Sequence, residues 1–251
     1  MAKKGETQPP FGMIGPVINA AGIVAGGVFG LAARKPMAAN YQLALKIVLG
    51  VYTLWFGLRL AWVSVNGSLR QVFKELCIVV LALALGKLAG KLMRLQKLSN
   101  SIGRHATRTL AAPTGQTRFN DGFLLATGLF CAGPLALLAS VQEGLTGFSP
   151  VFVVKAGIDG LATYAFCAKF GWGVALSAIP VLGLEGALVR GAQWLEPVLR
   201  NQPWPLLDAV NATDGLLIFC VAMIILEFKK VAVADYFPSL ALAPLLTWWL
   251  W

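Results

Sequence analysis

The sequence contains few of the side chains that build metal centres and enzyme active sites. His105 is the only histidine, which excludes a site with several histidine ligands. The four cysteines, Cys77, Cys131, Cys167 and Cys220, lie inside apolar runs and are not paired at metal-binding spacing, so we interpret them as small hydrophobic side chains. The sequence also lacks a GxSxG nucleophile elbow and a glycine-rich phosphate loop. We therefore expect neither an enzyme nor a cofactor-binding protein, and no metal can be named.

Charged residues are also scarce, at 13% of 251 residues against roughly 25% in soluble domains. Hydrophobic residues make up 57% of the chain, and the mean hydropathy is +0.72. A soluble domain of this length could not bury so much apolar surface. The apolar runs are continuous and do not alternate with polar residues, which indicates helices and not a β-barrel. The predicted fold is all-α, a polytopic transmembrane helical bundle forming one integral membrane domain over residues 1–251.

Eight apolar segments can be recognised, and we predict seven or eight membrane spans from them. They cover residues 13–31, 42–62, 75–93, 122–141, 151–170, 172–189, 215–228 and 231–251. The seventh segment is short, and Pro238 and Pro244 interrupt the eighth, so these two segments could form one crossing and one re-entrant piece. Residues 1–11 form a polar tail. The run after the tail has no clear cleavage site, so we interpret it as a retained first span.

Positive charge is concentrated around the segment 94–118, which follows the third span. The residues are Lys87, Lys91, Arg94, Lys97, Arg104, Arg108 and Arg118, in a chain whose net charge is +10. The positive-inside rule places this basic loop in the cytoplasm and the N-terminus outside. The charges are not interleaved with aromatic residues, so we expect no nucleic-acid partner. Leucines at helical spacing between Gly86 and Ile102 favour an amphipathic helix on the anionic inner leaflet, with a simple topology anchor as the alternative.

Glycines recur on single helix faces in two of the predicted spans. Gly22, Gly26 and Gly30 follow a four-residue spacing, and Gly86 and Gly90 repeat it. Small residues let membrane helices approach closely. The pattern predicts tight helix packing, either within one chain or between the two copies of a homodimer.

The chain also shows a weak internal repeat. A shift of 109 positions superimposes the first span on the fourth and the second on the fifth, with Lys46 on Lys155 and Trp55 on Tyr164. A repeat of three spans has an odd number of crossings, so its second copy must be inverted. Three-plus-three inverted repeats are common in secondary transporters, where the binding site lies between the copies.

Asp159 is the strongest candidate for a functional side chain. It lies near the middle of the fifth span, in KAGIDG, with Lys155 one turn earlier on the same face. An ionised side chain is costly at the centre of a bilayer, and such residues mark functional sites. The pair could be a neutralised structural ion pair, or the carboxylate could bind a cation or a proton when Lys155 moves. Gly157 and Gly160 favour the functional interpretation, because they allow close approach to the backbone.

A second candidate lies at the end of the fourth span, in CAGPLALLASVQEGLTG. Pro134, after Gly133, interrupts a helix because it lacks a backbone donor. Freed carbonyl groups at membrane depth could serve as cation ligands, and Gln142, Glu143 and Thr146 add further oxygens. The alternative is a kink followed by an ordinary interfacial loop.

Other polar residues in or near the spans are weaker candidates. Asn19 is an isolated amide in the first span, and it could either bond to another helix or reach a substrate. Glu185 lies in the sixth span, five residues before Arg190, and we assign it a structural role. Asp214, Glu227 and Asp235 lie at predicted span ends and are expected to be solvated.

Four motifs resemble the YqgA/YdfK-type family of bacterial inner-membrane proteins, a domain of unknown function. They are MIGPVINAAGIVAGGVFGLA, LFCAGPLALLASVQEGLTG, VVKAGIDG and YFPSLALAPLL, in this order over residues 12–248. The resemblance implies a multi-span inner-membrane protein, and at most a transporter. The residues that match the family pattern are Asn19, Gly26, Gly27, Gly30, Glu143, Gly144, Thr146, Gly147, Lys155, Asp159 and Pro238.

We therefore predict a transporter or channel for a cation or a proton-coupled small solute, in the bacterial inner membrane. Asp159 would be the ion site, Lys155 its counter-ion, Gln142 and Glu143 a gate or second ligand set, and Asn19 a lining group. The alternative is a membrane scaffold or sensor that recruits a partner or anionic lipid through the basic loop. The expected partners are the bilayer, a small ion or solute, anionic lipid at the basic loop and a second copy of the chain.

Overall fold

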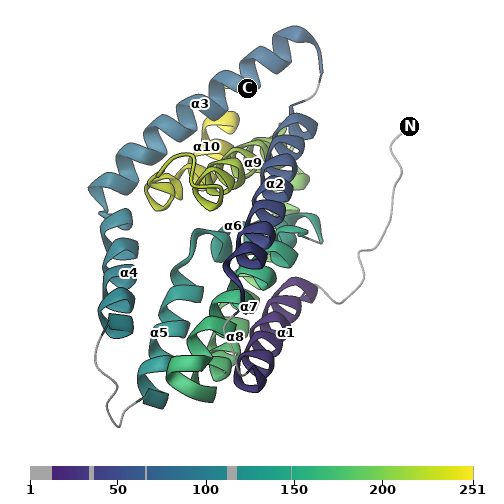
Figure 1. The fold of residues 1–251 in the computed structure, drawn as a ribbon. Helices are drawn as coiled ribbons and strands as arrows, with labels where there is room; N and C mark the ends of the chain where they lie inside the picture. Colours follow the sequence, from purple (N-terminus) through teal and green to yellow (C-terminus); the bar gives the residue numbers. More distant parts are fainter. Residues whose placement is uncertain (1–12, 34–36, 66, 112–117, 148, 251) are drawn as a thin grey trace.

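The computed structural model describes residues 13–33, 37–65, 67–111, 118–147 and 149–250, and the predicted tail 1–11 lies outside these ranges. The described chain folds into helices joined by short turns (Figure 1), which confirms the all-α prediction. The elements are α1 (Ile14–Ala32), α2 (Ala39–Ser64), α3 (Leu69–Leu92), α4 (Leu95–Ala111), α5 (Arg118–Ala132), α6 (Pro134–Thr146), α7 (Val151–Phe170), the 3-10 helix η1 (Gly171–Ser177), α8 (Ala178–Arg200), α9 (Leu206–Ile225), the 3-10 helix η2 (Val233–Tyr236) and α10 (Ser239–Leu250).

Several helices are long and apolar enough to cross a membrane. In the described chain there are four such stretches, Ile14–Ala32, Ala39–Ser64, Val151–Arg200 and Leu206–Ile225, or up to six if each of two bent helix pairs counts as one span. The predicted seven or eight spans are not confirmed. The eighth segment gives only η2 and α10, and the 12 residues of α10 are short of the roughly 20 that a crossing needs.

The long helical stretch Val151–Arg200 turns back on itself. The Nζ atom of Lys155 in α7 lies 3.2 Å from Oε1 of Glu185 in α8. A straight helix would separate two residues 30 positions apart by about 45 Å, so the chain must turn back between α7 and α8. The reversal begins at Gly171, whose φ of 71° is favourable only for glycine, and continues through η1. The predicted fifth and sixth segments are therefore separate helices, and α8 continues to Arg200, well beyond the predicted end at Val189.

The predicted basic loop is mostly a helix. α4 covers Leu95–Ala111, and residues 112–117 lie outside the described ranges. The chain bends by 60° between α3 and α4, where Arg94 adopts a left-handed conformation with φ 58°. The predicted amphipathic helix from Gly86 is thus divided, because Gly86 and Gly90 belong to α3.

The interruption predicted at Gly133–Pro134 is confirmed. α5 ends at Ala132, α6 begins at Pro134, and the two helices are bent by 54°. Pro134 occupies the first turn of α6, where a missing backbone N–H is tolerated. The predicted inverted repeat is not confirmed: its shift relates the unbroken α1 to this broken pair.

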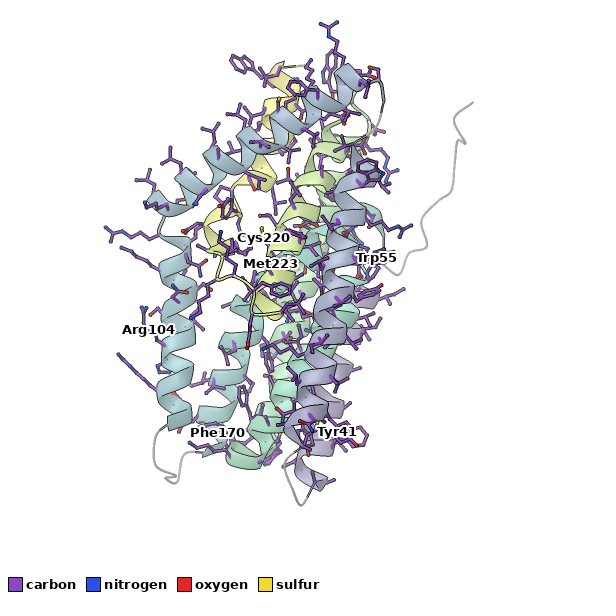
Figure 2. The ribbon with its side chains drawn as sticks, turned by 45° about the horizontal axis from the view of Figure 1, so that its top comes forward. Tyr41, Trp55, Arg104, Phe170, Cys220 and Met223 are labelled. Atoms are coloured by element: carbon purple, nitrogen blue, oxygen red, sulfur yellow. The ribbon has the colours of Figure 1, made fainter. Side chains whose placement is uncertain are left out.

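The surface of the bundle is largely apolar. Figure 2 shows side chains projecting outward along α2, among them Tyr41 and Trp55, which are both exposed. Large apolar side chains on α1, α3, α7 and α8 are exposed in the same way. The interior in turn holds buried polar residues, including Asn19, Glu143, Lys155, Asp159, Glu185 and Asp214. This distribution is expected of helices that contact lipid, because lipid solvates apolar side chains and disfavours charged ones.

The glycine faces form contacts between helices of the same chain. A Cβ atom on Gly26 would lie 2.1 Å from the backbone oxygen of Gly160 in α7, and one on Gly22 would lie 2.7 Å from that of Ala156. The partners advance together along both chains, so α1 and α7 are parallel. Gly86 and Gly90 of α3 pack in the same way against Ser239 and Asp235. The glycine spacing is thus explained without a second copy of the chain.

Candidate functional site: a buried charge cluster

Three helices bring four polar side chains together in the interior. Asn19 comes from α1, Lys155 and Asp159 come from α7, and Glu185 comes from α8, with exposed fractions of 0%, 2%, 6% and 0%. The sequence predicts the first three of these residues as site candidates. Because α1 packs against both α7 and α8, its polar side chain meets both carboxylates. We refer to these four residues as the charge cluster.

Lys155 lies at the centre of the charge cluster. Its ammonium group forms an ion pair with Oδ2 of Asp159, one turn later in α7. It also lies 3.2 Å from Oε1 of Glu185 and donates a hydrogen bond of 3.1 Å to the carbonyl oxygen of Phe130. An ammonium group has three donors, and each has a partner here.

The Phe130 carbonyl is available because of the helix break. In a continuous helix it would accept a hydrogen bond from the N–H of residue 134, but Pro134 has none. Lys155 supplies the missing donor. The sequence predicts that freed carbonyl groups at this break could bind a cation, and the cation that binds one of them is the ammonium group of Lys155.

Asn19 connects the two carboxylates. Its Nδ2 atom donates to Oδ2 of Asp159 at 3.1 Å and to the two carboxylate oxygens of Glu185 at 3.0 and 3.1 Å. The close approach that these bonds need comes from the glycine contacts between α1 and α7. Asn19 therefore bonds between helices, which is one of the two roles that its sequence position allowed.

The charges in this cluster do not balance when both carboxyl groups are ionised. Lys155 then contributes one positive charge, and Asp159 and Glu185 contribute two negative charges. A net buried charge is costly in a low-dielectric interior. The cluster is therefore chemically suited to take up one proton or one monovalent cation.

Glu143 holds the N-terminus of α1. Its Oε1 atom accepts a hydrogen bond of 2.9 Å from the backbone N–H of Gly15, and its side chain is fully buried. A carboxylate is favoured at this position, since the first N–H groups of a helix have no partners within it. Asn19 lies one turn later than Gly15, so Glu143 and the charge cluster hold successive turns of the same helix.

The other two predicted pathway residues contact each other. Nε2 of Gln142 donates to Oγ1 of Thr146 at 3.3 Å, and that hydroxyl donates to the Gln142 carbonyl oxygen at 2.7 Å. Neither of these two bonds reaches the charge cluster. Gln142 is nevertheless buried, whereas Thr146 is exposed.

The structure shows two buried carboxylates in surroundings that the sequence did not predict. Glu185, to which the sequence assigns a structural role, lies in the charge cluster with Asp159. Asp214 was expected to be solvated, and it is fully buried. This error came from the predicted start of the seventh span at residue 215, because α9 begins at Leu206 and places Asp214 near its middle. Position within an apolar run, which identified Asp159, is the signal that could have identified both.

The other two acidic residues predicted to be solvated, Glu227 and Asp235, are less buried than Asp214. Glu227 lies just beyond α9, is exposed and forms an ion pair with Lys46, whose hydrogen bond lowers the pKa of the Glu227 carboxyl. Asp235 is partly buried and accepts a 2.8 Å hydrogen bond from the backbone N–H of Gln96 in α4. It thus helps to hold α4 against η2.

Within the described ranges, no group of three or more His, Cys, Asp or Glu residues is placed to hold a metal ion.

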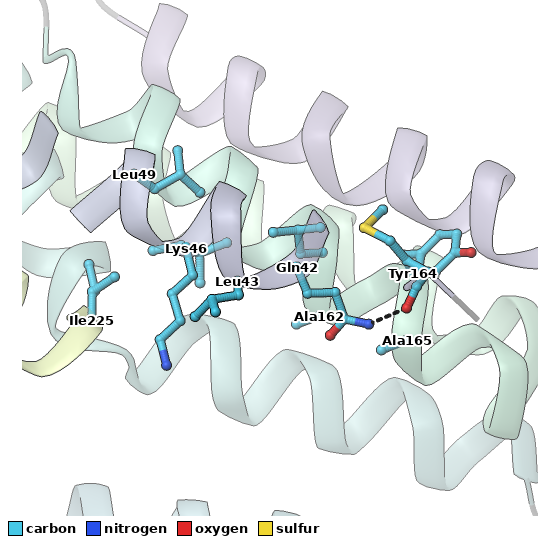
Figure 3. A pocket seen from close by; sticks show the side chains of 11 residues that line it. Gln42, Leu43, Lys46, Leu49, Ala162, Tyr164, Ala165 and Ile225 are labelled. Atoms are coloured by element: carbon cyan, nitrogen blue, oxygen red, sulfur yellow. Dashed lines mark hydrogen bonds between the residues drawn. The ribbon is translucent and has the colours of Figure 1, made fainter. Parts of the chain in front are cut away.

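Four cavities of about 500, 500, 550 and 720 Å³ open between the helices. One of them lies between α2 and α7, where Gln42 donates a hydrogen bond of 2.8 Å to the Met37 carbonyl oxygen beside Lys46 and Tyr164 (Figure 3). None of the four is lined by a residue of the charge cluster.

The fold and the site define a helical membrane protein with a charge cluster enclosed by its helices. The chain belongs to the family described as "Protein of unknown function (DUF554)", whose model matches residues 14–248. It is 24% identical to the uncharacterized membrane protein YdfK of Bacillus subtilis, over 92% of this chain and 94% of the relative. It is 26% identical to the uncharacterized protein YqgA of Escherichia coli, over 94% of this chain and 97% of the relative. No solved structure matches the fold.

Proposed function

We propose that this protein is a transporter or channel for a cation or a proton-coupled small solute in the bacterial inner membrane. The observation that carries the proposal is the charge cluster, with one ammonium group and two carboxyl groups all at most 6% exposed. Buried ionisable residues are expensive in membrane proteins and commonly lie on ion pathways and proton relays. The fixed excess of acidic groups attracts a proton or cation and repels an anion.

The contacts suggest a role for each residue. Asp159 and Glu185 bind the proton or cation, Lys155 is their counter-ion, and Asn19 keeps the two carboxylates near each other. A change in the charge of either carboxylate weakens the hydrogen bonds that hold α1. Charge uptake at the cluster is thereby coupled to the position of α1.

Glu143 acts as a latch in this proposal. It binds the first turn of α1 through the Gly15 N–H. When α1 moves away from α6 and α8, this bond and the bonds of Asn19 to the charge cluster must therefore both change. Gln142, the preceding residue, lies at the same end of α6 and belongs to the same gate. Such a movement would open the closed cluster to one side of the membrane, as alternating access or gated conduction requires.

The test is flux into proteoliposomes under a panel of imposed proton, sodium and potassium gradients. Asp159→Asn and Glu185→Gln should each reduce the active flux at least tenfold, because each removes a negative charge and leaves the shape of the side chain almost unchanged. Glu196→Gln is the matched control: Glu196 lies on α8 like Glu185, but its partner Arg200 is exposed. Wild-type flux in Asp159→Asn under every gradient would contradict the assignment of Asp159.

A second candidate function is membrane sensing or recruitment through α4. Lys97, Arg104 and Arg108 are exposed on this helix, and Arg104 points away from the bundle in Figure 2. No acidic residue occurs between Glu75 and Asp121, so the segment has a strong positive charge. Basic residues beside an anionic leaflet each contribute about 1 kcal/mol of attraction.

This second candidate predicts lipid-dependent stability. Anionic phosphatidylglycerol added to the detergent-solubilised protein should raise its Tm more than zwitterionic phosphatidylcholine does. The triple variant Lys97→Gln, Arg104→Gln, Arg108→Gln should lose most of that difference. The control variant Lys229→Gln, Lys230→Gln removes exposed charges just beyond α9 and should keep it. Equal responses in the two variants would show that general surface charge, and not α4, attracts the lipid.

A further inference from the structure

Asp214 is a second buried carboxylate, and it differs from those of the charge cluster in having no partner. It lies near the middle of α9 and is 0% exposed. Both of its carboxylate oxygens are buried, and no donor among the described residues forms a hydrogen bond with either of them. A buried carboxylate without a donor or counter-charge is strongly unfavourable, so Asp214 is either protonated or has its charge compensated by a ligand.

Two amide side chains near Asp214 present further oxygens of the same kind. Asn211 lies one turn earlier on the same face of α9, and it is 8% exposed. Gln142 of α6 is 4% exposed. Its Oε1 atom, like Oδ1 of Asn211, is buried without a hydrogen-bond partner within the described chain.

The packing of α6 against α9 places Gln142 at the level of Asp214. On one side, Leu145 of α6 and Val210 of α9 belong to the same hydrophobic cluster. On the other side, Leu138 of α6 and Leu217 of α9 belong to a second cluster. Gln142 lies between Leu138 and Leu145 on the same face of α6.

Asp214 lies between Val210 and Leu217 on the corresponding face of α9. The two polar side chains therefore occupy the layer between the two hydrophobic clusters, where α6 meets α9. Within this layer, the partnerless atoms are all oxygens, from one carboxylate and two amides.

We propose that Asp214, Asn211 and Gln142 form a binding site for an alkali-metal cation, separate from the charge cluster. Carboxylate and amide oxygens are the ligands that hard cations prefer. The single carboxylate favours a monovalent ion, because a divalent ion would leave a net positive charge in the interior. Such an ion would satisfy the four orphaned oxygen atoms and neutralise the charge of Asp214 at once.

The site can be tested by cation-dependent stability of the full chain in detergent. Tm is measured in lithium, sodium, potassium and choline chloride at equal ionic strength. With wild type, one alkali cation should raise Tm by about 3 °C or more for each tenfold rise in concentration above half-saturation, while choline has no effect. Asp214→Asn should abolish this response. Asp208→Asn, which changes the same residue type in the first turn of α9 at a partly exposed position, should keep it.

The amide ligands provide a test that does not depend on how Asp214→Asn folds. Asn211→Leu and Gln142→Leu should each weaken the apparent cation affinity at least fivefold, since each removes one oxygen and no charge. The proposal is overturned if no alkali cation shifts the wild-type Tm relative to choline. It is equally overturned if Asp214→Asn keeps the response, or if both amide variants bind like wild type.

This inference stands or falls separately from the proposed function. A response that Asp214→Asn loses and Asp159→Asn keeps places the cation at α9, whatever the flux measurements show. A response that Asp159→Asn loses and Asp214→Asn keeps overturns the α9 site and supports ion binding at the charge cluster.

Discussion

Lys155→Met should be among the most destabilising substitutions in this protein. The change leaves Asp159 and Glu185 side by side in the interior with Asn19 as their remaining donor. Removing one partner of a buried ion pair typically costs about 3–5 kcal/mol, because the other charge stays buried and uncompensated. For a chain of this length we expect Tm to fall by about 10 °C or more, or the protein to accumulate poorly in the membrane.

A second substitution should reverse much of this loss. Lys155→Met combined with Asp159→Asn removes one positive and one negative charge, so a single carboxylate remains beside two amides. The double variant should recover at least half of the lost Tm. The effects of the two changes are not additive, because the two side chains are in contact. Such recovery would identify charge imbalance, and not lost packing of the lysine stem, as the cause.

Lys46→Met is the matched control. Lys46 also forms an ion pair, but its partner Glu227 is exposed, and the pair contributes little in water. The variant should melt close to wild type at neutral pH. If Lys155→Met also melts within about 3 °C of wild type, the two cluster carboxyls do not carry the charges that we assign to them, and the proposed ion site loses its basis.

The sequence was most informative where the spacing of residues along one helix carries the signal. The apolar run 151–170 matches α7 at both ends, and Lys155 and Asp159 share a face at helical spacing. The glycines of α1 predicted a close helix contact because their four-residue spacing needs no knowledge of the partner. These features depend on helical geometry alone.

The partners of those features could not be predicted in the same way. Glu185 joins Lys155 only because the chain reverses at Gly171, and no local pattern specifies where α8 then lies. Asp214 was misplaced by a boundary error of nine residues, since LLDAVNATD continues the helix despite its polar residues. Helix boundaries and long-range packing are set by tertiary contacts, which is why the surroundings of Glu185 and Asp214 could not be predicted from the sequence.

Helix α1 links most of the site, because its successive turns contact different partners. Gly15 is held by Glu143, Asn19 reaches two carboxylates, and Gly26 rests on the backbone of α7. The glycine contacts set the distance at which Asn19 can bond. Close packing of α1 is therefore a condition for the charge cluster to form.

Gly26→Val should consequently disrupt both the fold and the site. A Cβ atom at this position would lie 2.1 Å from the backbone oxygen of Gly160, which cannot move without shifting α7 itself. Overpacking commonly costs about 1–3 kcal/mol, and more where only backbone can yield. We expect a Tm loss of about 10 °C or a largely aggregated protein, measured by thermal unfolding and by size exclusion in detergent.

Gly183→Val separates this steric effect from the general cost of a β-branched residue in a helix. Gly183 lies inside α8, and a Cβ atom there would have no neighbour within 4 Å. This variant should stay monodisperse and melt near wild type. In proteoliposomes, any Gly26→Val protein that does fold should lose flux as Asp159→Asn does, because a displaced α1 withdraws Asn19 from the carboxylates. Equal Tm values for the two valine variants would mean that α1 and α7 do not pack closely at Gly26. Asn19 would then not lie where it can bond to both carboxylates of the charge cluster.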